Sequence, residues 1–77
     1  MAVKVFYPDN TTRVVQRADA ALQRDGFVTI GRWDSSRRNV EELENLPLSA
    51  VVAVEVTDRR GVVTQIVSGL AKSSDRQ

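Results

Sequence analysis

The chain has 77 residues with no Cys and no His, and its formal net charge is +1 with an isoelectric point near 8.3. This length accommodates one hydrophobic core and no second domain. The absence of imidazole and thiol groups excludes Ser–His and Cys–His catalysis and the usual ligands of a structural zinc, and the balanced charge does not by itself indicate a nucleic acid or a membrane as partner.

The first predicted element is a β-hairpin. Residues 2–7 alternate apolar and polar side chains, residues 8–11 have the composition of a turn, and residues 12–16 resume an extended pattern. The side chains that should share one face of the first strand are Val3, Val5 and Tyr7.

A second hairpin is centred on Asp25-Gly26, the type of dipeptide that adopts positive φ at both central turn positions, and residues 27–33 leave it as a strand. The preceding residues, 18–24, allow two conformations. Their composition favours a helix, whereas the alternation of Ala18, Ala20 and Leu22 and the adjoining turn favour a strand. Because seven residues are too few for a helix that depends on its own propensity, we predict a strand.

The segment 39–46 has apolar residues at a spacing of three and acidic residues near its start. Ser36 is a candidate N-cap, and Pro47 would end a helix just beyond the segment. We therefore predict one short helix here, with a strand over the same residues as the alternative.

The C-terminal part predicts a long hairpin, in which the β-branched segment 49–56 and the strand 62–67 flank a turn at 57–61. Both faces of 51–56 are almost entirely apolar, which is typical of a central strand covered on both sides. Glu55 is the exception, and we expect it to point outward because an inward carboxylate would need an Arg partner.

Together these elements predict a mainly β fold, namely a small antiparallel barrel or curled sheet of five to six strands with one short helix; the alternative is an α+β fold with two short helices. Residues 1–70 are expected to form a single small β-rich domain, and residues 71–77 a flexible tail. No segment approaches the length of a membrane span and the N-terminus lacks a secretory pattern, so we expect a soluble cytoplasmic protein with no membrane partner.

The ionisable residues do not form a recognisable reaction centre. Lys4 and Lys72 lie near the chain ends, where an amine is hard to desolvate enough to become a nucleophile. The acidic residues Glu41, Glu42 and Glu44 are expected on a solvated helix face, because adjacent side chains on a helix point apart. We therefore predict that the protein is not an enzyme and has no catalytic residues, no cofactor, no metal site and no small-molecule substrate.

The most informative cluster is 32–38, where the only Trp, Trp33, lies among three Arg and two Ser at the end of a strand. Because so small a core needs its Trp, the residue types favour a buried Trp33 and an ion pair of Asp34 with Arg37 or Arg38. The other interpretation is a contact surface, which Phe6, Tyr7 and two further Arg could extend. Its candidate residues are Arg32, Trp33, Arg37, Arg38, Arg59 and Arg60.

These observations favour a non-catalytic binding or assembly domain that recognises a protein partner or forms a homo-oligomer, since a small chain without disulfides gains stability from association. The alternative is a single-stranded nucleic-acid-binding module that uses Arg32, Trp33, Arg37 and Arg38, with the indole stacking on a base and the guanidinium groups on phosphates. Only an exposed Trp33 could serve as a docking platform in either case.

Overall fold

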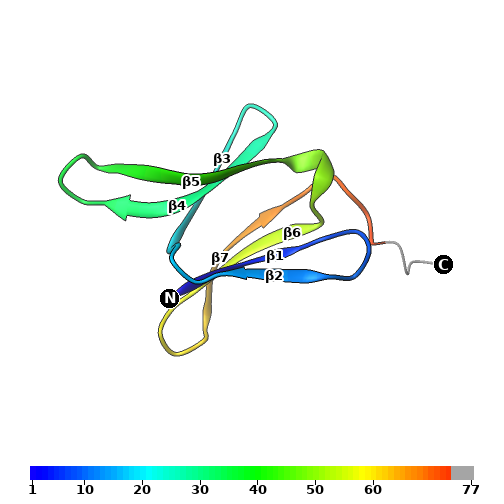
Figure 1. Cartoon of the computed structure of the whole chain (residues 1–77), viewed down its shortest axis with the longest axis horizontal. Helices are drawn as coiled ribbons and strands as arrows, with labels where there is room; N and C mark the ends of the chain where they lie inside the picture. Colours follow the sequence, from blue (N-terminus) through cyan, green and yellow to red (C-terminus); the bar gives the residue numbers. More distant parts are fainter. Residues whose placement is uncertain (74–77) are drawn as a thin grey trace.

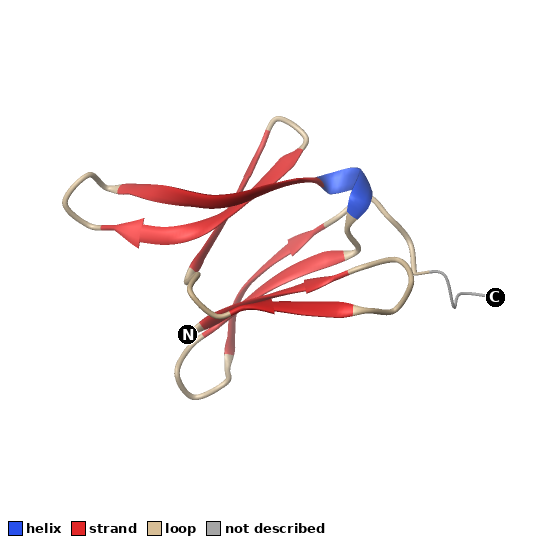
Figure 2. Ribbon diagram, viewed as in Figure 1, coloured by secondary structure: helices blue, strands red, loops and turns tan. Residues whose placement is uncertain are grey.

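The computed structural model describes residues 1–73 of the chain. These residues form seven strands and one short 3-10 turn, so the mainly β prediction is confirmed, with more strands than the five to six expected. The elements, shown in Figures 1 and 2, are β1 (Ala2–Phe6), β2 (Thr12–Val15), β3 (Ala20–Arg24), β4 (Phe27–Asp34), β5 (Asn39–Pro47), η1 (Leu48–Ala50), β6 (Ala53–Thr57) and β7 (Val63–Ser68).

The strands form two antiparallel sheets. One sheet has four strands in the order β2-β1-β6-β7, and the other has three strands in the order β3-β4-β5. No backbone ladder joins the two sheets within residues 1–73, so a closed barrel is not found there and stays a prediction.

Side chains bridge the two margins where the sheets approach each other. At one margin, the amide Nε2 of Gln65 in β7 donates a hydrogen bond of 2.8 Å to the carbonyl oxygen of Ala21 in β3. At the other, the guanidinium of Arg13 in β2 binds the carboxylate of Glu44 in β5. The two sheets are therefore held edge to edge by side chains, where a closed barrel would have a backbone ladder.

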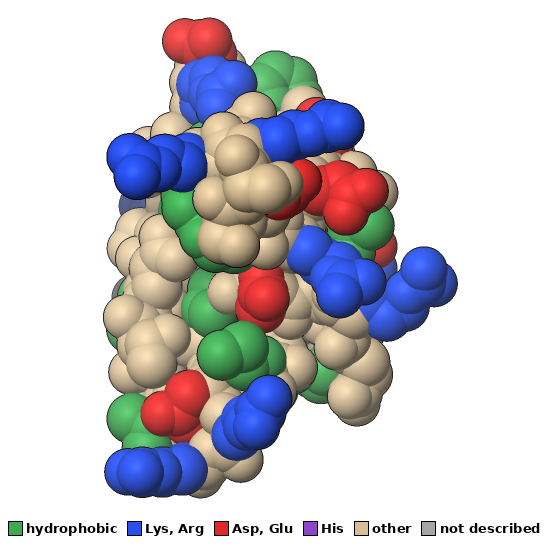
Figure 3. All heavy atoms as spheres, turned by 90° about the vertical axis from the view of Figure 1, so that its left-hand side faces the viewer, with side chains coloured by type: hydrophobic (Ala, Val, Ile, Leu, Met, Phe, Trp, Pro, Cys, Tyr) green, Lys and Arg blue, Asp and Glu red, His purple; other side chains and the backbone are tan. Residues whose placement is uncertain are grey.

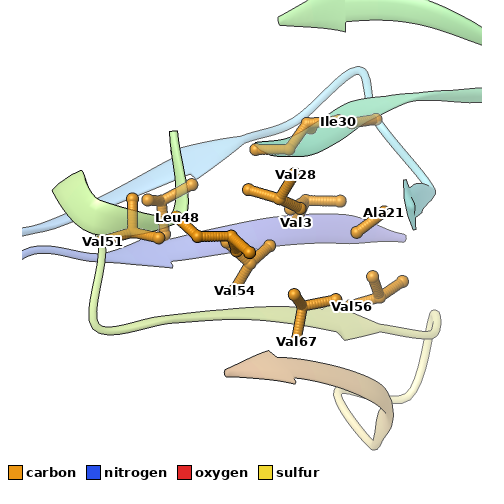
Figure 4. Packing of buried hydrophobic residues seen from close by; sticks show 11 residues of the cluster. Val3, Ala21, Val28, Ile30, Leu48, Val51, Val54, Val56 and Val67 are labelled. Atoms are coloured by element: carbon orange, nitrogen blue, oxygen red, sulfur yellow. The ribbon is translucent and has the colours of Figure 1, made fainter. Parts of the chain in front are cut away.

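The core lies between the facing sheets and consists of Val, Ala, Ile and Leu side chains (Figure 4). Alternate residues of β1 point into it, and those of β4 meet them from the other sheet. Tyr7 packs only against the edge of this cluster, and no aromatic side chain of the described residues is buried within it. The buried side chains are Val3, Val5, Ala18, Ala21, Val28, Ile30, Leu48, Val51, Val54, Val56 and Val67.

The turn predictions are confirmed for the first two hairpins. In the second, Arg24 pairs directly with Phe27, which leaves Asp25 and Gly26 as a two-residue loop with φ of 51° and 80°. Positive φ at both positions matches the twist of the flanking strands, so the loop fixes the register of β3 on β4. The strand prediction for residues 18–24 is confirmed over Ala20–Arg24.

The short helix predicted for residues 39–46 is wrong, because these residues form strand β5 along the whole length of β4. The apolar spacing of three arises from a register shift of β5 opposite Ile30 and Gly31. Leu46 lies on the core side of the shift, Leu43 falls at it, and Val40 lies beyond it on the opposite face. The extra residue at the bulge therefore gives this strand an apolar spacing of three, which resembles the period of a helix.

The C-terminal hairpin forms as predicted, but the expectation that both its faces are covered is wrong. β6 lies inside the four-stranded sheet and β7 at its edge, and only the face carrying Val54, Val56 and Val67 is buried. Glu55 points to the outer face, where it lies opposite Lys4 and Ile66, as expected for an unpaired carboxylate.

Residues 69–71 continue from β7 and bind back to the segment around η1. The amides of Gly69, Leu70 and Ala71 donate to the carbonyl oxygens of Val52, Leu48 and Val51, respectively. Ser73 also contacts Asn10 through its hydroxyl, and residues 74–77 of the predicted tail lie outside the described residues. Within residues 1–73, no helix is long and apolar enough to cross a bilayer.

Candidate functional site

The outer part of the β4–β5 hairpin projects beyond the rest of the molecule, at the left of Figure 1. We call this part, residues 31–42, the arm. It begins at the register shift between Ile30 and Gly31 and ends in the turn formed by residues 35–38. Its position at the extremity of the molecule leaves most of its side chains exposed.

Gly31 allows the two strands of the arm to approach closely at the register shift. A Cβ atom at this position would collide with the backbone carbonyl of Glu41, so no other residue fits without displacement of β5. Asp19, which precedes β3, fixes the same region: its amide donates to the Gly31 carbonyl oxygen at 2.9 Å, and its Oδ1 accepts from the amide of Trp33 at 2.8 Å. The base of the arm is thus anchored to Asp19 at Gly31 and at Trp33.

Asp34 organises the tip of the arm. Its Oδ1 accepts hydrogen bonds from the hydroxyl of Ser36 at 2.7 Å, from the Ser36 amide at 3.0 Å and from the Arg37 amide at 3.3 Å. The hydroxyl bond from Ser36 lowers the pKa of Asp34 below its ordinary value, so the residue is a carboxylate at neutral pH. Its Oδ2 lies 3.8 Å from Nε of Arg37, which confirms the predicted ion pair of Asp34 with Arg37.

Trp33 is not a core residue, and the prediction that favoured burial is wrong. Its side chain is 54% exposed and lies directly opposite Val40 of β5, on the same face of the sheet. Val28 and Ile30 already occupy the core face of β4 and are fully buried, whereas Trp33 belongs to the other face and lies beyond the register shift. The core is thus filled by aliphatic side chains of β4, and the indole is left at the surface.

The arm carries balanced charge. Arg32, Arg37 and Arg38 supply three positive charges, and its three carboxylates are those of Asp34, Glu41 and Glu42. Arg32 lies directly opposite Glu41 in the ladder, so charges of opposite sign face each other across the strands. Figure 3 views the molecule from this end, where basic, acidic and hydrophobic side chains are interspersed.

The other residues predicted for the contact surface do not join the arm. Arg59 and Arg60 lie in the turn between β6 and β7, and Figure 1 shows this turn well separated from the tip of the arm. Phe6 and Tyr7 lie at the far end of β1, away from the arm. Of the predicted contact residues, the structure therefore places Arg32, Trp33, Arg37 and Arg38 in the arm, with Arg32 on the opposite face of the hairpin from Trp33.

Sequence reasoning missed Val40 as the apolar neighbour of Trp33, because residues 39–46 were assigned to a helix. It also missed the bridge between Arg13 and Glu44, which are 31 positions apart in the chain. Nη1 and Nη2 of Arg13 donate to the carboxylate of Glu44 at 2.7 and 2.6 Å, and Nη2 also donates to the hydroxyl of Tyr7 at 3.0 Å. The bond from Arg13 lowers the pKa of Glu44, and the same bond raises that of Arg13, so both stay charged.

A small hollow of about 170 Å³ lies beside the tip of the arm, lined by Asp34, Arg37, Asn39, Val40 and Glu41. This volume is below the roughly 300 Å³ at which pockets for drug-sized ligands begin. A second hollow, of about 290 Å³, lies at the far end of β1 and has no part in the arm. The arm is therefore suited to contact with a surface more than to enclosure of a small molecule.

No family model, curated protein or solved structure matches this chain. Any function must therefore be argued from the chemistry of the site itself.

Proposed function

We propose that the chain is a non-catalytic binding domain that recognises a protein partner through the arm. The observation that carries the proposal is the half-exposed Trp33, placed beside Val40 at the end of a projecting hairpin. An indole can bury about 200 Å² on contact, and Trp and Arg are the residues most enriched among those that dominate the energy of protein interfaces.

The charge pattern around Trp33 supports a protein partner. Protein interfaces typically combine a small apolar centre with a mixed polar rim. The arm has this composition: Trp33 and Val40 form an apolar pair on one face, and three Arg and three carboxylates lie on the same arm. A phosphate backbone is bound by an excess of basic groups, because affinity comes from the release of its counterions. Glu42, which lies on the same face of the hairpin as Trp33, would repel phosphates there.

The arm is also held in one geometry before any partner binds. Asp19 fixes its base through two hydrogen bonds, and Asp34 fixes its tip through three. A preorganised loop loses less conformational entropy on binding than a mobile one, so more of the contact energy appears as affinity. This arrangement fixes the backbone that carries the indole.

Chemical crosslinking in the native host, followed by reconstitution with the purified partner, tests the proposal. Trp33→Ala should weaken the reconstituted complex by about thirtyfold, which corresponds to about 2 kcal/mol for a dominant contact residue. Phe27→Ala is the matched control, because Phe27 is an exposed aromatic residue on the same strand but outside the arm. Equal affinity of the two variants for every partner would contradict the proposal.

Single-stranded nucleic acid is the alternative partner, and it is favoured by the exposure of Trp33 next to Arg32. It predicts that an oligonucleotide quenches the fluorescence of the single Trp and that added salt reverses the binding steeply. Unchanged fluorescence in low salt, with protein binding that depends on Trp33, supports the protein partner over this alternative.

A further inference from the structure

The edge strands of the two sheets differ in how they are protected against pairing with other chains. Exposed edges usually carry charged residues or Pro, which hinder the addition of a further strand. Within the described residues, β2 carries Arg13, β3 carries Arg24, and β5 carries three Glu and ends at Pro47. The fourth edge, β7, reads Val-Thr-Gln-Ile-Val-Ser and contains neither a charged residue nor Pro.

The exposed side chains of β7 include two apolar ones beside three uncharged polar ones. Ile66 is 60% exposed on the outer face of the four-stranded sheet, and Val63 is exposed as well. The irregularity in the β6–β7 pairing lies near Val63, so Gln65–Ser68 form a regular stretch against β6. This stretch offers a flat, uncharged edge for a further strand.

The neighbouring sheet does not pair with this edge. β3 approaches β7, but within residues 1–73 the two strands share no backbone ladder, and the hydrogen bond between them comes from the side chain of Gln65. Beyond Ser68 the chain leaves the edge, because Gly69 and Leu70 bind to the segment around η1. Within residues 1–73, the edge of β7 that faces away from β6 thus has no partner strand in a backbone ladder.

We propose that β7 pairs antiparallel with β7 of a second copy of this chain, which joins two four-stranded sheets into one sheet of eight strands. Two-fold symmetry brings the same edge of each copy together, so the edge must be complementary to itself. Because β7 has no charged residue, no register places like charges opposite each other. Strands β2, β3 and β5 each carry charged residues, so some registers of their self-pairing place like charges opposite each other.

The small size of the core is a second reason to propose that another copy of this chain pairs with the β7 edge. The core of the described residues contains eleven buried side chains, all aliphatic, and a chain of 77 residues buries a modest fraction of its surface. Pairing of two β7 strands covers Ile66 in both copies and satisfies backbone groups at both edges, which stabilises the folded state by mass action. The arm belongs to the other sheet, so this dimer is independent of the proposed partner contact.

Sedimentation equilibrium tests the dimer with a matched pair of variants. Ile66→Lys places a charge on the β7 edge opposite Glu55, and Val14→Glu places one on the β2 edge opposite Lys4 of the same sheet. Each variant replaces an exposed apolar side chain by one that can pair with its neighbour, so both monomers should fold. The wild type should shift from 8.5 kDa towards twice that mass with concentration.

Ile66→Lys should raise the dimer dissociation constant about tenfold or more, while Val14→Glu should leave it unchanged. Amide hydrogen exchange of the wild type should show protection of residues 63–68, but not of residues 12–15, that grows with concentration. Ser68→Lys, at an exposed position within the regular stretch, repeats the test on the same edge if Ile66→Lys fails to fold. A wild-type monomer at millimolar concentration, or a dimer that only Val14→Glu dissociates, would overturn the proposal.

Discussion

The two halves of the β4–β5 hairpin belong to the same pair of strands but have opposite environments. On one side of Gly31, Val28 and Ile30 are fully buried between the sheets. On the other side, Trp33 is mostly exposed and the strands leave the body of the protein. The comparison shows that a register shift at one glycine separates a segment that stabilises the fold from one that is free to contact a partner.

Substitutions on either side of Gly31 should therefore affect different measurements. Changes in the buried half should lower the free energy of unfolding, and changes in the arm should alter binding with little effect on stability. The following predictions test this separation, beginning with the largest expected effect.

Ile30→Ala should reduce the free energy of unfolding by about 3 kcal/mol, because it leaves a cavity in a fully buried site. Urea unfolding monitored by circular dichroism measures this loss. Asn45→Ala, an exposed position on β5 that accepts one hydrogen bond from the hydroxyl of Thr29, serves as the control and should change stability by about 1 kcal/mol or less. A similar loss for both variants would show that burial does not distinguish this half of the hairpin.

Gly31→Ala should cost about 2 kcal/mol and also weaken partner binding, because the added methyl group collides with the backbone of Glu41 and displaces the arm. Among these predictions, it is the one substitution expected both to lower the free energy of unfolding and to weaken partner binding. Gly61→Ala is the comparison: a Cβ there has open space, and only the strain of positive φ remains, about 1 kcal/mol. Unaltered arm resonances in the NMR spectrum of Gly31→Ala would contradict this role for Gly31.

Glu44 lies next to the register shift, and its bridge to Arg13 should make stability depend on pH. Its pKa is lowered in the folded state, so the bridge contributes fully above the ordinary pKa of 4.5 and is lost as the pH falls through the folded value. Since both side chains are partly exposed, the expected loss is about 0.5 kcal/mol. Glu44→Gln should abolish this part of the pH dependence in urea titrations between neutral pH and pH of about 3.

Trp33→Ala should change the free energy of unfolding least, by about 0.5 kcal/mol or less, because the indole is mostly exposed. The wild-type protein should accordingly show the red-shifted emission of a hydrated indole, quenched by iodide without denaturant. Blue-shifted emission that resists iodide would place Trp33 in a buried environment and remove the distinction between the two halves.

The parts of the fold that depend on local chemistry could be predicted from the sequence. The Asp25-Gly26 turn specifies its hairpin because few dipeptides tolerate positive φ twice, and the alternation in β1 identifies its buried face. The conformation of residues 39–46 could not be predicted in the same way. Its pattern contains a bulge opposite Ile30 and Gly31, where Gly31 packs against the backbone of Glu41, and this contact belongs to the pairing with β4 and not to the local sequence of residues 39–46.

The residue types of the candidate site could be predicted from the sequence, but their exposure and placement could not. The cluster of Arg32, Trp33, Arg37 and Arg38 was identified, but the exposure of Trp33 depends on which face of β4 the core uses and on how far β4 extends past it. Arg59 and Arg60 were grouped with the cluster because they are chemically alike, and the order of the strands places them elsewhere. Similarity of residue type carries no information about such non-local placement.

The pairing of β1 with β6 has a consequence for the order of events during folding. Val3 lies opposite Val56, so the first strand obtains its second neighbour only after most of the chain is available. The early β1–β2 hairpin is marginal alone, since two strands bury little apolar surface. The slow step should therefore be the closure of this long loop, on the millisecond-to-second timescale typical of β proteins rich in distant contacts. During synthesis, the four-stranded sheet should not form until β6 has been synthesised.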